Sequence, residues 1–129
     1  MSETPNVATV RRLYASGMAP DVVAEIVSPE LVWDITPGFP FGWIYHGWDE
    51  VGSQFFGKLA PNFTAFGAVP ISFDGDGDQV FVQGHYHAER PSGAAADIRF
   101  VHVWSVRDGL LSHLGQVADS HEMQELLNA

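Results

Sequence analysis

The sequence predicts an α+β domain in which helices come first and antiparallel strands follow. In the first sixty residues, apolar side chains recur mostly at helical spacing, whereas from residue 63 onward they alternate in strand fashion between short turn sequences. The chain has 129 residues, 46% of them hydrophobic, which is enough for one core. We therefore expect a single domain over residues 1–129.

Two short helices are expected at the start. Residues 7–15 place their apolar side chains on one helical face, and Gly17 follows as a stop signal. A second helix is predicted to begin at Asp21, whose side chain can cap it, and to end before Pro29.

A strand and a third helix are expected next. Residues 31–36 alternate and are rich in strand-forming residues, and residues 37–42 form a loop containing two prolines and two glycines. A helix is predicted from about residue 49 to 59, with Asp49 and Glu50 near the positive end of its dipole. Its apolar face consists of Val51, Phe55, Phe56 and Leu59.

The second half is predicted to be a meander of four strands followed by a short helix. The strands are residues 63–73, 79–90, 97–106 and 110–118, and the helix is residues 119–127. The acidic run Asp74–Asp78 is predicted to be a solvated turn, because it lacks the bidentate Glu and flanking helices of a calcium loop. A strongly curved sheet wrapped around the third helix would leave a hollow, and small molecules bind in such hollows.

Composition excludes several functions. The net charge is −10 and the six Lys and Arg residues are scattered, so we expect neither nucleic acid nor a membrane surface as a partner. The absence of Cys excludes thiolate nucleophiles and thiolate metal ligands. With no apolar signal core at the start, a cytoplasmic location is the default expectation.

The order of elements resembles that of SnoaL-like, nuclear transport factor 2-like proteins, which include polyketide cyclases, ketosteroid isomerase and limonene epoxide hydrolase. The most specific segments are Tyr45-His46-Gly47 through Phe56, and Arg107 through Ser120. This resemblance implies a cone-shaped, mostly antiparallel sheet around N-terminal helices, with one apolar pocket. It implies no single reaction, because this fold hosts enzymes and binding modules alike.

The family's usual carboxylates are replaced in this chain. Seven residues after the hairpin Gly109, where epoxide hydrolases and cyclases carry a carboxylate, the residue is Gln116. The resemblance aligns Gln83 and His85 with the Arg and Asp of the epoxide hydrolases. A glutamine cannot abstract a proton, so these replacements argue against epoxide hydrolysis.

The strand at 79–90 offers four polar side chains on one face, namely Gln83, His85, His87 and Glu89. The family register points Gln83, His85 and His87 into the pocket, and the alternative is that they form a solvated or subunit-facing surface. A His-x-His pair with His102 as a third ligand could hold a metal. The helical first half and the early Glu89 do not fit a cupin metal site, so we expect no metal and no cofactor.

Asp34 and Tyr14 correspond in place to catalytic groups of ketosteroid isomerase. There a carboxylate near the position of Asp34 moves the proton, and a first-helix Tyr donates to the oxyanion. However, strand alternation places Trp33 on the apolar face and Asp34 opposite it, so a partly exposed Asp34 at the strand end is the preferred interpretation.

Two further features allow two readings each. Asp119 could replace the missing carboxylate, but Asp119 and Glu122 form a capping box, which is the preferred interpretation. The loop aromatics Phe39, Phe41, Trp43 and Tyr45 could close the pocket mouth or pack under the sheet edge.

Two hypotheses on function follow. In the first, the chain is a cofactor-independent isomerase, cyclase or lyase acting on a small, mostly apolar, carbonyl-bearing molecule. His85 is then the leading acid or base and Asp34 the second catalytic candidate, while the expected substrate-binding residues are Tyr14, Trp33, Gln83, His87, His102, Leu114 and Gln116. In the second, it is a ligand-binding or association domain without turnover. In either case the resemblance implies a homodimer through the outer sheet face.

Overall fold

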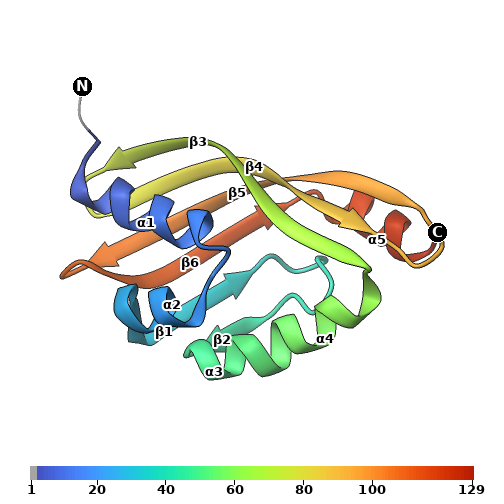
Figure 1. Ribbon diagram of the computed structural model, residues 1–129, viewed down its shortest axis with the longest axis horizontal. Coiled ribbons are helices and arrows are strands. Elements are labelled where there is room, and N and C mark those ends of the chain that lie inside the picture. The colour runs from blue at the N-terminus through green and yellow to red at the C-terminus, as the bar shows by residue number, and fades with distance from the viewer. Residues whose placement is uncertain (1–2) are drawn as a thin grey trace.

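The protein consists of helices packed against a curved six-stranded sheet, as the computed structural model of residues 3–129 shows (Figure 1). The strand order is β2-β1-β6-β5-β4-β3, and every neighbouring pair is antiparallel except β1 and β6. The predicted α+β class is confirmed: N-terminal helices cover a mostly antiparallel sheet, and a short helix ends the chain.

The first two helices form where expected, with one difference at a cap. Helix α1 (Pro5–Ala15) begins after Thr4, whose hydroxyl accepts from the amide of Val7, and it buries Val7, Val10 and Leu13. Helix α2 (Pro20–Ile26) has Ala19 at its N-cap position. The prediction that Asp21 caps α2 is wrong, because Pro20 already occupies the first helical turn, where proline is favoured.

Strand β1 (Val27–Ile35) follows α2 directly and starts four residues earlier than predicted. It pairs antiparallel with the three-residue β2 (Ile44–His46) and parallel with β6 (Leu110–Ala118). Trp33 and Ile35 are buried on the inner face of β1. The parallel pairing joins an early strand to the final strand of the sheet.

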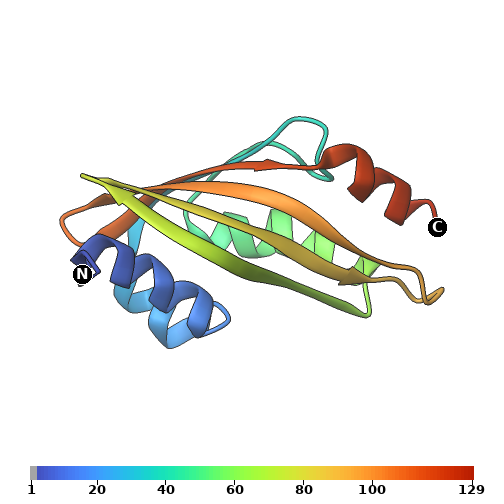
Figure 2. The same ribbon diagram turned by 90° about the horizontal axis from the view of Figure 1, so that it is seen from above.

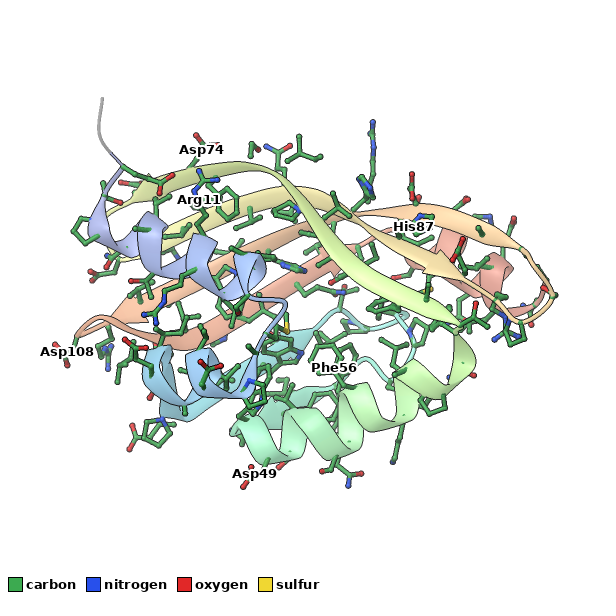
Figure 3. The ribbon with its side chains drawn as sticks, viewed as in Figure 1. Arg11, Asp49, Phe56, Asp74, His87 and Asp108 are labelled. Atoms are coloured by element: carbon green, nitrogen blue, oxygen red, sulfur yellow. The ribbon has the colours of Figure 1, made fainter. Side chains whose placement is uncertain are left out.

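A helical segment over residues 48–62 lies across the inner face of the sheet. It comprises α3 (Trp48–Glu50), a π-helical turn (Val51–Phe56), α4 (Gly57–Leu59) and a 3₁₀ turn (Ala60–Asn62). Within the π turn, the amide of Gly57 donates to the carbonyl of Gly52. The predicted apolar face is confirmed, since Val51, Phe55 and Leu59 are buried. Phe56 lies between this segment and the sheet (Figure 3).

Three long strands complete the sheet with β6: β3 (Ala65–Asp76), β4 (Gln79–Glu89) and β5 (Ala95–Arg107). Strand β3 continues through most of the acidic run, so only Gly77 and Asp78 form the turn. The register of β3 against β4 shifts between Pro70 and Ser72, and β3 bends along its length (Figure 1). This bend contributes to the curvature that encloses the core.

The two faces of the sheet have different environments. Helices α1 and α2 lie on one side of it (Figure 2). The face toward the helices carries the buried residues, such as Val80, Val82, Trp104 and Leu114. The opposite, outer face carries exposed side chains, including Val69, Val101 and Val117.

Helix α5 (Ser120–Leu127) closes the end of the molecule opposite α1 (Figure 2). The carboxylate of Asp119 accepts from the amide of Glu122 at 3.0 Å, which confirms the predicted N-cap. Met123 and Leu126 are buried. The guanidinium of Arg90 donates to the carbonyls of Asn62 and Leu127, linking α5 to the helical segment.

Replacing the cap should destabilise the fold. We expect Asp119→Ala to lower the free energy of unfolding by about 1 kcal/mol, because the first-turn amides lose their acceptor. Asp119→Asn retains a side-chain oxygen and should stay close to the wild type. Urea unfolding measures both variants, and equal stability of Asp119→Ala and wild type would contradict the cap.

Candidate functional site

A pocket of about 480 Å³ lies between the helical segment and the inner face of the sheet. This volume is within the usual range for small-molecule sites. Most of its wall is aromatic or aliphatic, and the lining residues include no Lys, Arg, Asp or Glu. The lining residues are Tyr14, Gly17, Met18, Trp33, Ile35, Trp48, Phe55, Phe56, Ala60, Phe66, Gly67, Ala68, Tyr86 and His102.

Three of the lining residues form a hydrogen-bonded chain, which we call the Tyr-His-Tyr chain: Tyr14, His102 and Tyr86. The Tyr14 hydroxyl contacts Nδ1 of His102, and the Tyr86 hydroxyl lies 2.6 Å from Nε2. Both ring nitrogens of His102 therefore have a phenol partner. His102 and Tyr86 are almost completely buried.

Strand alternation assembles this chain. His102 lies on β5 between the inward-facing Phe100 and Trp104, and its ring stacks on Phe100 at a centroid distance of 3.8 Å. Tyr86 reaches it from β4, and Tyr14 reaches it from α1. The ring planes are therefore held by packing as well as by hydrogen bonds.

Two more side chains support the phenols from behind. The indole Nε1 of Trp104 donates to the Tyr14 hydroxyl at 2.9 Å, and Nε2 of Gln116 donates to the Tyr86 hydroxyl at 3.1 Å. The amide of Thr36 can only donate, and it faces Oε1 of Gln116 at 3.3 Å. That contact orients the NH₂ group of Gln116 toward Tyr86.

Burial keeps the Tyr-His-Tyr chain uncharged. It lowers the pKa of His102 to about 3 and raises the pKa of Tyr14 and Tyr86 above the usual range of a phenol. At neutral pH the three residues therefore carry three hydrogens on their heteroatoms: two hydroxyl hydrogens and one imidazole N–H.

A count of these hydrogens shows what the chain can offer a ligand. The two contacts to His102 use two of the three hydrogens, while Trp104 and Gln116 bring hydrogens of their own. If Nε2 is protonated, Tyr14 donates to Nδ1 and the Tyr86 hydrogen is left over. If Nδ1 is protonated, the Tyr14 hydrogen is left over. In both tautomers one hydroxyl hydrogen has no acceptor within the described network, and both tyrosines line the pocket.

The structure brings together only some of the predicted site residues. Tyr14, Trp33 and His102 line the pocket as expected. Gln116 lies behind Tyr86, and Leu114 is buried in the core beside Trp33 and Trp104 without lining the pocket. The indole N–H of Trp33 is buried without a hydrogen-bond partner, and edge-to-face contacts join its ring to Trp48, Phe56 and Trp104.

The expectation that Gln83, His85 and His87 face the pocket is wrong. On β4 the buried inward positions are Val80, Val82 and Tyr86, so the alternate residues point outward. Gln83 and His85 line a shallow depression on the outer face, and His87 binds Asp97 at 2.7 Å. The hydrogen bond to Asp97 raises the pKa of His87. His87 lies on the side of β4 away from Phe56 (Figure 3).

Asp34 is also outside the pocket. It lies on the outer face of β1, where it pairs with Ile44 and Gly115, while its neighbours Trp33 and Ile35 face inward. Asp34 is half-buried there, which agrees with the partly exposed position that the alternation of β1 predicts.

Tyr86 is the site residue that sequence reasoning missed. It lies on the face opposite the four polar residues of its strand, and that face is the inner one. The signal was present in the sequence, because Val80 and Val82 precede Tyr86 at period two and mark the buried face.

The four aromatic residues of the loop before the helical segment do not all behave alike. Phe39 and Tyr45 are buried against Phe55 in the core, whereas Phe41 and Trp43 are exposed. None of the four lines the pocket.

No group of three His, Asp or Glu side chains within residues 3–129 is arranged to hold a metal ion. His102 lies on the inner face and His85 and His87 on the outer face, so these three cannot share one ion. In the same part of the chain, no helix is long and apolar enough to span a membrane.

The buried neutral His102 should make stability depend on pH. Its pKa is 6.5 in a model peptide and about 3 in the fold, so below about pH 6.5 the unfolded state binds a proton that the folded state does not. The contribution of His102 to the free energy of unfolding has its full value above about pH 6.5. It declines by up to about 1.4 kcal/mol per pH unit as the pH falls toward 3.

Histidine NMR measures the protonation state of His102 directly. The His102 ring signals should remain those of a neutral imidazole at pH 5. The free energy of unfolding of His102→Phe should fall less steeply between pH 6.5 and 5 than that of His46→Gln, the control variant that replaces an exposed histidine. An imidazolium spectrum for His102 at pH 5 would contradict the assignment.

Similar solved structures confirm the fold. An NTF2-like protein of unknown function from Burkholderia pseudomallei K96243 is 26% identical, with a TM-score of 0.85 over 98% of this chain and 100% of that one. TerC, co-crystallised with polyporic acid, is 22% identical, with a TM-score of 0.88 over 98% and 100% of the two chains. A candidate SnoaL-like polyketide cyclase from Jannaschia sp. CCS1 is 20% identical, with a TM-score of 0.83 over 100% and 98%.

Sequence comparison gives the family. No curated protein sequence matches the chain significantly. The model of the SnoaL-like domain matches residues 8–114, which run from α1 into the last strand and include Tyr14, Tyr86 and His102. The chain therefore belongs to the SnoaL-like domain family and has the NTF2-like fold.

Proposed function

We propose that the pocket binds a small, mostly apolar molecule through a carbonyl oxygen. The observation that carries this proposal is the unused hydroxyl hydrogen of the Tyr-His-Tyr chain in a mostly apolar pocket. A carbonyl oxygen accepts such a hydrogen and has none to donate, and the aromatic wall favours a flat hydrocarbon skeleton.

Any acid–base turnover in this pocket would use Tyr14, His102 and Tyr86, because among residues 3–129 no other titratable side chain lines it. His85 and Asp34, first considered as catalytic groups, lie on the outer face. A neutral imidazole between two phenols can pass a proton along its hydrogen bonds without forming a buried ion. The absence of a carboxylate from the wall supports the alternative of ligand binding without turnover.

A matched pair of ligands tests the carbonyl contact. We expect 1-tetralone to bind about 2- to 10-fold more tightly than 1-methylenetetralin, in which CH₂ replaces the oxygen, because a net hydrogen bond contributes about 0.5–1.5 kcal/mol. Titration calorimetry or quenching of tryptophan fluorescence measures both affinities. Polyporic acid, co-crystallised with TerC, is a further probe. Equal or tighter binding of the methylene compound would contradict the proposal.

A pair of variants on one strand tests the location. Ala68 lines the pocket and Ala65 lies outside it at the start of β3. Ala68→Phe should fill the pocket and abolish binding of 1-tetralone, whereas Ala65→Phe should bind it like the wild type. Unchanged binding by Ala68→Phe would place the ligand elsewhere.

We further propose that a second copy of the chain covers the outer sheet face. Val117 and Ile71 are 62% and 68% exposed there, and Val101 pairs with Val117 on the adjacent strand. The same face carries Arg99 and Asp97, so it offers both signs of charge beside apolar surface. A surface of this kind can complement itself across a two-fold axis.

Light scattering tests this assembly. The wild type should have twice the 14.1 kDa mass of one chain, and Val117→Lys should be a monomer because it places a charge in the apolar centre. Gln54→Lys changes an exposed position on the helical segment and should remain dimeric. A monomeric wild type would exclude the homodimer.

A further inference from the structure

The Tyr-His-Tyr chain offers an acceptor as well as a donor. When Nε2 of His102 is protonated, the Tyr86 oxygen receives hydrogens from His102 and Gln116, and its own hydrogen is free. The Tyr14 oxygen then receives only the hydrogen of Trp104 and keeps one lone pair. When Nδ1 is protonated the roles reverse, so that Tyr14 donates and Tyr86 has the free lone pair.

In each tautomer, one end of the chain presents a hydrogen and the other end presents a lone pair. The two phenol oxygens stand on opposite sides of the imidazole ring, and all three residues line the same pocket. A ligand that bridges them needs a carbonyl oxygen at one end and a hydroxyl at the other. Reversing the ligand requires only the other tautomer of His102.

We propose that this pocket selects conjugated hydroxy-carbonyl compounds, such as the enol form of a cyclic 1,3-diketone, with Tyr14 and Tyr86 each bound to one oxygen. In such a vinylogous acid the hydroxyl and the carbonyl are separated by a rigid unsaturated unit and point away from each other. They therefore cannot satisfy each other within the ligand. This inference rests on the proposed carbonyl binding and adds the second contact.

The pocket binds such a ligand as the neutral molecule. Its lining residues provide no Lys or Arg to pair with an enolate, and a charge would be costly in this aromatic surrounding. Burial likewise keeps His102 neutral, so the imidazole supplies no positive charge. Affinity should therefore fall as the pH rises above the pKa of the free ligand.

The test compares 5-phenyl-1,3-cyclohexanedione with its methyl enol ether, 3-methoxy-5-phenylcyclohex-2-enone, below the measured pKa of the dione. The ether keeps the carbonyl and loses the hydroxyl hydrogen. We expect the enol to bind about tenfold more tightly by calorimetry, because a second hydrogen bond is formed. We also expect its affinity to decline once it ionises.

Conservative variants separate the two contacts. Tyr14→Phe and Tyr86→Phe should each reduce the advantage of the enol over its ether, because one phenol oxygen of the bridge is gone and only the ring nitrogen of His102 behind it can take its place. Each variant still has at least one spare hydrogen, because the remaining phenol and His102 share one contact and the former partner Trp104 or Gln116 loses its acceptor. 1-Tetralone should therefore continue to bind better than 1-methylenetetralin. Tyr45→Phe is the matched control, since Tyr45 is buried, donates to the carbonyl of Phe41 and does not line the pocket.

The outcomes distinguish the two proposals. If 1-tetralone keeps its advantage but the enol binds no better than its ether, the hydroxy-carbonyl inference is wrong and carbonyl binding stands. Tighter binding of the ionised dione would also overturn the inference. If 1-tetralone has no advantage over 1-methylenetetralin, carbonyl binding fails and this inference fails with it.

Discussion

The burial of a neutral imidazole between two phenols is the interaction on which the pocket depends. His102 stacks on Phe100 and binds Tyr14 and Tyr86, so one residue joins α1, β4 and β5. An unpartnered polar group at this depth would cost several kcal/mol, and both of its nitrogens are satisfied. The same arrangement leaves one hydroxyl hydrogen of the pocket lining without an acceptor in the hydrogen-bonded chain.

Much of the fold could be predicted because its signals are local. The helical spacing in α1, the Asp119 cap and the Asp-Gly turn after β5 depend on neighbouring residues, and all three appear in the structure. The cap of α2 was misassigned because Ala19, with no capping side chain, precedes Pro20. Local preferences decide the elements, and they are weakest at element ends.

The candidate site was harder to predict because the choice of sheet face is a long-range property. On β4, either of two sets of alternate residues could face inward, and family register favoured the set containing His85 and His87. The apolar partners Val80 and Val82 decide the matter, since burying them places Tyr86 inside. His102 was recognised as a pocket residue, but its role depends on partners 16 and 88 residues away in the sequence. No local pattern reports such contacts.

The parallel pairing of β1 with β6 has a consequence for synthesis of the chain. Trp33 and Ile35 on β1 pair with Leu114 and Gln116 of β6, and on its other edge β1 pairs with the short β2. During translation the edge of β1 that pairs with β6 must therefore wait for most of the chain to leave the ribosome, whereas its apolar face can already contact the helical segment 48–62. Contacts that span so much sequence also slow folding through loop-closure entropy.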